Sequence, residues 1–305
     1  MYKSILTSLL IAVSLINLQA QQSSNKIHVE DLHHFWAAYE SFKETSDYSV
    51  FDSMYLDIGS AGLKNFIKGR IVSAKNLSLY VAGYKDYLAE LKTSTDQIVQ
   101  YQPQIEEIFL NLKEIYPAAK IPDVYFVIGA FNSGGTSSNA GLIIGAEMYG
   151  KTDSTDMKRF NRWLREVLEP VSEVPHIVAH ELIHFQQSYR GYNLLTNCLM
   201  EGSADFIAEI ISGKNINDHV HAFANPREEE LWEEFRKVMF KMKKDGWLYT
   251  SAEGRPNDLG YWMGYKICQA YYDQMEDKTQ AINDILNIKN AKKFLAQSGY
   301  GNQFE

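Results

Sequence analysis

The chain has 305 residues, of which 45% are hydrophobic and 22% are charged. This length and composition are typical of a globular protein with a sizeable core, and they exclude wholesale disorder and collagen-like structure. The 30 Lys and Arg residues against 38 Asp and Glu residues give a net charge of −8, which argues against nonspecific binding to nucleic acid or to an anionic membrane. Two cysteines are too few for a disulfide scaffold or a Cys-rich zinc module.

The first twenty residues predict export. Lys3 precedes an apolar stretch from Ile5 to Leu18, which is too short to span a membrane, and a signal-peptidase site follows at Leu18-Gln19-Ala20. We expect residues 1–20 to be a cleaved signal peptide, with a membrane anchor as the alternative. The processed protein is then periplasmic or extracellular, without stable membrane insertion. No Cys follows the apolar stretch, so lipidation is not expected.

Residues 21–119 are predicted to form a helical N-terminal region. An aromatic-rich helix is expected to begin at Asp31, and Ser60 is expected to cap a helix that continues through Phe66 and Ile67. Apolar residues at spacings of three and four predict further helices over residues 73–91 and 95–116.

Residues 120–305 are predicted to form a second region, which we do not expect to fold independently of the first. The composition predicts a strand over Val124–Ile128, a loop over Asn132–Ser138 and a second short strand over Leu142–Ala146. Helices are then expected at 156–168, 174–189, 197–212, 226–244 and 258–276, with Gly213 ending the third of these. The sequence therefore predicts an α+β fold that is predominantly helical and contains a short β-sheet.

One motif carries most of the chemical information. The segment His180-Glu181-Leu182-Ile183-His184 has the form HExxH. A helix places residues four apart on one face, so the two histidines can bind one zinc ion, with Glu181 beside the water that such an ion activates. The alternative is a surface helix with scattered histidines. The histidine row lies away from the apolar stripe of this helix, so we do not expect it on the core face. His176, one turn earlier, is expected not to be a ligand.

Glu201, in the next predicted helix, is the predicted third zinc ligand. Asp205, one turn further on, is then placed to accept a hydrogen bond from the free ring nitrogen of a ligand histidine. We prefer Glu201 to Asp205 and Glu209 because Gly202 and Ala204 leave room for the two helices to approach each other. The alternative is a pair of exposed acids on a solvated helix.

The HExxH motif followed by Glu-x-x-x-Asp on the next helix resembles the gluzincin type of zinc metallopeptidase. The chain also resembles the DUF2268 family of predicted Zn-dependent proteases, which is related to gliding-motility lipoproteins of Bacteroidota. The resembling segments are Ser60–Phe66, Pro175–Gln187, Glu201–Asp205 and Asp258–Tyr265. The resemblance implies a zincin-like core with an HExxH active-site helix. It also implies that Leu142–Ala146 is an edge strand able to pair with an extended peptide, the alternative being a plain core strand.

The predicted function is a secreted zinc metallopeptidase that acts on a peptide or protein, with zinc as its cofactor and Glu181 as its general base. Two other functions stay open. One is a non-catalytic zinc-binding protein of the envelope or of the motility machinery, and the other is a zinc hydrolase that acts on a non-peptide bond. Cys198 and Cys268 can either pair in an oxidising compartment or remain free buried thiols.

The mechanism also needs a group that stabilises the tetrahedral oxyanion. Tyr261 and Tyr265, one helical turn apart, are the first candidates, and simple packing is the alternative for each of them. His219, His221 and Arg255 are weaker candidates for the same role.

Overall fold

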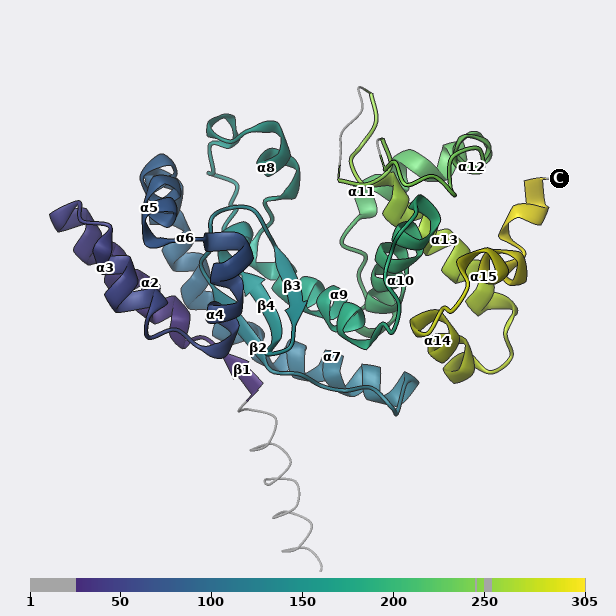
Figure 1. The fold of residues 1–305 in the computed structure, drawn as a ribbon, viewed down its shortest axis with the longest axis horizontal. Helices are drawn as coiled ribbons and strands as arrows, with labels where there is room; N and C mark the ends of the chain where they lie inside the picture. Colours follow the sequence, from purple (N-terminus) through teal and green to yellow (C-terminus); the bar gives the residue numbers. More distant parts are fainter. Residues whose placement is uncertain (1–25, 245, 250–253, 305) are drawn as a thin grey trace, which may run out of the picture. The chain divides into compact units, whose positions relative to one another are not determined.

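The structure of the chain is a computed structural model that describes residues 26–244, 246–249 and 254–304 (Figure 1). The predicted signal peptide at residues 1–20 therefore lies outside the described residues. The fold is α+β and predominantly helical, as predicted, with one four-stranded sheet. Within the described part of the chain, no helix has both the length and the apolar character needed to cross a membrane.

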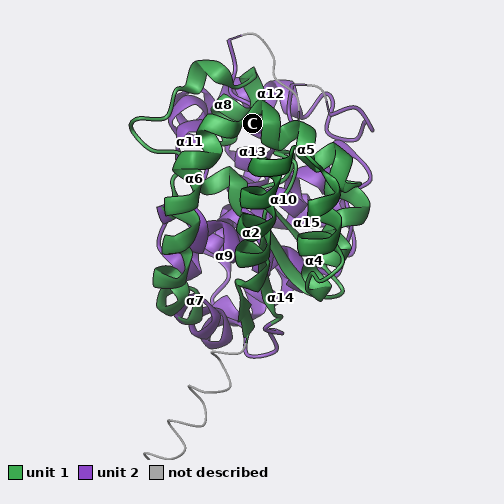
Figure 2. Ribbon diagram, turned by 90° about the vertical axis from the view of Figure 1, so that its left-hand side faces the viewer, with its two compact units in different colours: residues 1–106, 122–171 green, residues 107–121, 172–305 purple. Residues whose placement is uncertain are grey.

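The chain divides into two compact units (Figure 2). Unit 1 consists of residues up to 106 together with residues 122–171, and unit 2 consists of residues 107–121 and 172–305. The predicted boundary between residues 119 and 120 separates two regions of the sequence, and it stays a prediction.

The elements of unit 1 are the helices α2 (Glu30–Thr45), α3 (Ser49–Phe51), α4 (Ala61–Phe66), α5 (Ala74–Gly83), α6 (Lys85–Gln97) and α8 (Arg162–Val167) and the strands β1 (Ile27–His28), β2 (Val124–Val127), β3 (Gly135–Ser138) and β4 (Gly141–Gly145). The helices of unit 2 are α9 (Val174–Gln186), α10 (Leu194–Ser212), α11 (Asp218–Ala224), α12 (Glu228–Phe235), α13 (Leu259–Gln274), α14 (Lys278–Leu286) and α15 (Ala291–Ser298). Helix α7 (Gln102–Ile115) begins in unit 1 and continues in unit 2.

The sheet of unit 1 has the strand order β1-β2-β4-β3, with β3 antiparallel to β4 and the other pairs parallel. Two predictions are wrong here. Part of the expected loop at Asn132–Ser138 forms the strand β3. The strand consists of Gly, Thr and Ser and is only partly buried, so it lacks the apolar residues by which a strand is recognised in a sequence. The expected edge strand at Leu142–Ala146 corresponds to β4, which pairs with β2 and β3 and is buried along its length. The alternative, a core strand, is therefore confirmed, and β1 and β3 are the edge strands.

The helices of unit 1 are shorter and more numerous than predicted, since α7 begins at Gln102 instead of residue 95 and α8 begins at Arg162 instead of residue 156. Ser60 caps α4 as predicted, since its Oγ accepts a hydrogen bond from Leu63 N at 3.1 Å. Asp31 of α2 holds this cap in place by accepting a hydrogen bond from Ser60 N at 3.1 Å. The single helix predicted over residues 73–91 is two helices, α5 and α6, because the backbone leaves the helical conformation at Tyr84.

In unit 2, helices α9, α10 and α13 correspond closely to predicted helices, whereas α11, α14 and α15 were not predicted. Helix α10 begins with a capping box between Asn193 and Thr196, and it ends at Gly213 with a φ of 78°, as predicted. The predicted helix over residues 226–244 is much shorter, because α12 ends at Phe235. Cys198 and Cys268 are both buried free thiols.

The residues that follow α12 bond to the start of α10 instead of continuing a helix. Leu194 N donates to Lys241 O at 2.8 Å, and Leu195 N donates to Met239 O at 2.7 Å. The first backbone amides of a helix have no acceptor within the helix, and here the carbonyls of Lys241 and Met239 accept their hydrogen bonds.

Helix α10 also packs very closely against α13. A Cβ atom added to Gly264 would lie 1.7 Å from Cys198 O, and one added to Gly202 would lie 2.1 Å from Tyr265 N. Both neighbours are backbone atoms, which cannot rotate away. The predicted reason for Gly202, close approach to the HExxH helix, is therefore wrong, because this glycine lets α10 approach α13.

We predict that Gly264→Ala destabilises the protein by about 1–3 kcal/mol or more, because the added methyl group forces α10 and α13 apart. The matched control is Gly83→Ala, also at a helical position, where an added Cβ meets no atom within 4 Å. This control should be neutral or stabilising by up to about 1 kcal/mol. Urea unfolding of the two variants measures both effects, and equal stability of the two would contradict the close-contact explanation.

Candidate metal site

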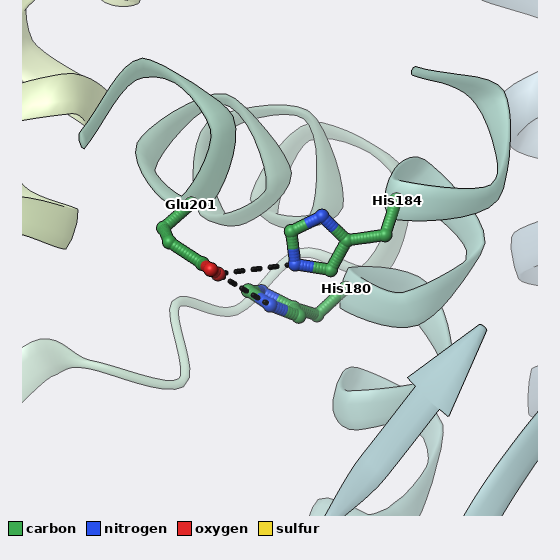
Figure 3. Close-up of side chains that lie close together, drawn as sticks. All are labelled: His180, His184 and Glu201. Carbon is green, nitrogen blue, oxygen red and sulfur yellow. Dashed lines mark hydrogen bonds and ion pairs between the residues drawn. The ribbon is translucent and has the colours of Figure 1, made fainter. Parts of the chain in front are cut away.

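Two helices of unit 2 bring three potential metal ligands together. His180 and His184 lie one turn apart on the same face of α9, and Glu201 lies on α10, which packs against α9. One donor atom from each residue can be chosen so that all three lie within 4.8 Å of one another. Figure 3 shows both rings directed towards the carboxylate of Glu201. The Oε2 atom of Glu201 lies 3.1 Å from His184 Nε2 and 3.8 Å from His180 Nε2.

The chemistry and spacing of these donors fit a zinc ion. Zinc is bound by imidazole nitrogen and carboxylate oxygen at about 2.0–2.2 Å, so that tetrahedral ligands lie about 3.4 Å apart. The two measured separations lie on either side of that value. Three protein ligands leave a fourth position for water or substrate, which is the arrangement of catalytic rather than structural zinc sites.

The ring of His180 is oriented by an acid on α10. His180 Nδ1 lies 2.7 Å from Asp205 Oδ1, and Asp205 Oδ2 accepts a second hydrogen bond from Asn217 Nδ2 at 2.7 Å. Because a carboxylate only accepts hydrogen bonds, His180 Nδ1 is the donor and Nε2 faces the cluster without a proton in the neutral ring. The structure therefore places Asp205 beside a histidine of the cluster, where the sequence predicted a supporting acid.

The ring of His184 is oriented by Gln187. The amide nitrogen of Gln187 donates to Met200 O at 2.7 Å and to Ser203 Oγ at 2.9 Å, which fixes the orientation of the amide. Its oxygen, Oε1, then faces His184 Nδ1 at 2.9 Å and must accept a hydrogen bond from it. Nε2 of His184 is thus also the atom presented to the cluster.

Tyr249 is the third residue that supports the cluster. Its hydroxyl donates to Glu201 Oε1 at 2.5 Å, which leaves Oε2 to face the two histidines. The residue has a φ of 60°, a left-handed conformation that is uncommon outside glycine. Tyr249 N donates a hydrogen bond to Asp258 Oδ1 at 2.9 Å, so the residue that immediately precedes α13 helps to position this tyrosine.

The charges of the cluster stabilise one another. Burial lowers the pKa of His184, but the charge and hydrogen bond of Glu201 outweigh it, and the pKa rises to about 9. Burial raises the pKa of Glu201, but the two histidines and the Tyr249 hydroxyl lower it to about 2. At neutral pH the protonated His184 ring therefore pairs with the Glu201 carboxylate, and a metal ion would replace that proton.

The remaining predicted site residues fall into different surroundings. Glu181 lies next to His180 on α9, and its charge contributes to the raised pKa of His184. The ring of Tyr261 stacks on His180 with the ring centroids 6.1 Å apart. The ring of Tyr265 packs against Phe206 and His221. Burial, together with the charge and hydrogen bond of Glu209, raises the pKa of Tyr265.

The burial of the cluster corrects one prediction. His180 is 4% exposed, Glu201 is 6% exposed and Asp205 is 1% exposed. The histidine face of α9 was not expected to lie in the core, but it packs against α10. The reading of Glu201 and Asp205 as exposed acids on a solvated helix is therefore also wrong. His176 is not part of the cluster.

Sequence reasoning missed Gln187, Asn217 and Tyr249. Gln187 lies one turn after His184 on the same face, so its spacing was a usable signal. Asn217 and Tyr249 lie in connections between helices, and tertiary packing alone brings them to Asp205 and Glu201.

We predict that the neutral rings of His180 and His184 both carry their proton on Nδ1. Nitrogen–proton correlation spectra of the metal-free protein at about pH 10, above the pKa of His184, identify the tautomer of each ring. His33, which is exposed, is the internal control. A proton on Nε2 of either cluster histidine would show that Asp205 or Gln187 does not orient that ring as described.

The comparisons with known proteins agree with part of the predicted relationship. No curated protein and no solved structure matches the chain. The family described as "Gliding motility protein GldB" matches residues 17–302, which cover most of both compact units and include every residue of the cluster. This confirms the predicted relation to gliding-motility proteins. The chain belongs to the GldB family of gliding motility proteins.

Proposed function

We propose that the protein is a zinc-dependent hydrolase of the gluzincin type and that its substrate is a peptide or protein. The observation that carries this proposal is the His180, His184 and Glu201 cluster with Glu181 beside it. Two histidines, one carboxylate and a second, non-ligand carboxylate are the groups that zinc-dependent hydrolysis requires. The hydrogen bonds from Asp205, Gln187 and Tyr249 support it further, because a metal site needs ligands that are already oriented.

The chain's own residues can perform the acid–base steps of such a reaction. When bound, zinc supplies a Lewis acid that polarises a carbonyl group and lowers the pKa of a water molecule. Glu181 accepts a proton from the attacking water and delivers it to the leaving amine. Tyr261 is better placed than Tyr265 to donate a hydrogen bond to the oxyanion, because it stacks on His180 whereas Tyr265 bonds to Glu209.

Family membership supports a second candidate function. A protein of the gliding-motility machinery can bind zinc without turning over a substrate, and the cluster would then hold α9 and α10 together as a structural site. Glu181 favours the hydrolase, since a purely structural site needs no carboxylate beside its metal. Both functions agree with a location in the cell envelope, as the predicted signal peptide implies. A hydrolase that acts on a non-peptide bond would use the same ligands and the same base, so only the identity of the substrate separates that function from peptide cleavage.

We predict that Glu201→Ala weakens zinc binding more than Asp205→Ala does. Glu201 is the proposed ligand, and Asp205 only orients His180, so its loss should reduce zinc affinity by about 10–100-fold. Glu209→Ala is the matched control on the same helix and should leave zinc affinity unchanged. Competition titrations with a zinc chelator rank the three variants. If Asp205→Ala proved the more damaging change, the ligand and its support would have to be exchanged.

We predict that Glu181→Gln keeps zinc and fold but lowers hydrolysis by about 10²–10⁴-fold, because the amide cannot accept a proton. A degenerate peptide library, with chelator-treated protein as the control, first identifies cleaved sequences. The variant is then assayed on one of them, with zinc content measured in the same sample. Cleavage at the parental rate would exclude Glu181 as the base. A parent protein that binds zinc but cleaves nothing would favour the structural function instead.

A further inference from the structure

A basic segment with exposed apolar side chains lies between α12 and Tyr249 in unit 2. Residues 236–244 contain five cations and no acid, whereas the whole chain has a net charge of −8. The cations are Arg236, Lys237, Lys241, Lys243 and Lys244. Phe240 and Met242, between them, are 48% and 69% exposed. We call residues 236–244 the basic segment.

The structure fixes the basic segment on the body of unit 2. Its carbonyls at Met239 and Lys241 accept hydrogen bonds from the first amides of α10, as described above. Lys244 Nζ donates to Asn197 Oδ1 at 2.9 Å, which ties the end of the segment to the same helix. The exposed side chains are therefore presented on an anchored backbone.

The cations of the segment differ in how far neighbouring residues compensate them. Arg236 pairs with Glu233 of α12 at 2.7 Å, so its charge is partly neutralised. The side chains of Lys237 and Lys241 are exposed. Lys292 of α15 adds a cation, since its Nζ lies 5.9 Å from the centroid of the Phe240 ring.

We propose that the basic segment is a contact surface for an anionic lipid membrane. Lysines next to such a surface are attracted by its negative potential, and exposed Phe and Met side chains insert at the boundary between headgroups and acyl chains. Protein interfaces are depleted in lysine, whereas four of the five cations of the basic segment are lysines, so its composition fits a membrane better than an acidic protein partner. The net charge of −8 argues against nonspecific membrane binding of the whole surface, but this patch is local. The proposal does not depend on the proposed hydrolase activity.

The test is binding of the purified protein, without the predicted signal peptide, to lipid vesicles. We compare vesicles of phosphatidylcholine mixed with phosphatidylglycerol and vesicles of phosphatidylcholine alone, at physiological ionic strength. The parent should bind only the anionic vesicles. The double variant K237Q/K241Q should bind them roughly 30-fold more weakly. The double variant F240S/M242S should bind them at least about tenfold more weakly, because it loses only the inserted side chains.

Two control variants make the same chemical changes elsewhere. K75Q/K85Q removes two exposed lysines, and L79S/L110S removes two exposed leucines. Both should bind as the parent does, and circular dichroism confirms that all variants are folded. Failure of the parent to bind anionic vesicles, equal binding to both lipids, or an equal loss in the controls would overturn the proposal. Binding to polyglutamate would also overturn the proposal if it were as strong as binding to the vesicles and were unaffected by F240S/M242S. That result would indicate an acidic protein partner.

Discussion

Helix α10 packs between α9 and α13, and the candidate metal site depends on this packing. On one side, the facing glycines Gly202 and Gly264 bring the backbones of α10 and α13 into direct contact. On the other side, α10 presents Glu201 and Asp205 to the histidines of α9. The glycine contact and Glu201 are adjacent in the sequence, so a shift of α10 along α13 would also move the carboxylate away from His184.

Burial gives the cluster its chemical character. A buried carboxylate or imidazolium is costly unless it is paired, and here each charged group has a partner. In the metal-free protein, Glu201 and protonated His184 satisfy each other. Hydrogen bonds from outside the cluster direct the ring nitrogens and one carboxylate oxygen inward. The donor atoms are therefore already directed towards one point, and a metal ion bound there would replace a proton rather than rearrange the helices.

The helical half of the fold and the centre of the site could be predicted because their signals are local. The spacing within HExxH and the spacing from Glu201 to Asp205 are properties of single helices, so they hold whatever surrounds them. Tyr249 lies in the long connection between α12 and α13, and Asn217 lies in the short connection between α10 and α11. Neither position has a helical spacing from the site, so the sequence does not reveal their contacts with Glu201 and Asp205. The strand β3 was missed because Gly, Thr and Ser at an edge read as a loop. The length of α12 was overestimated because the carbonyls that follow it cap α10.

The central claim is that His180, His184 and Glu201 form one zinc site. X-ray absorption spectroscopy of the protein loaded with one equivalent of zinc tests this claim most directly. The account predicts two imidazole nitrogens at about 2.0–2.1 Å, and oxygen ligands at about 2.0–2.2 Å, in a four-coordinate first shell without sulfur. A first shell that contains sulfur, or one without imidazole, would contradict it, as would a protein that takes up no zinc.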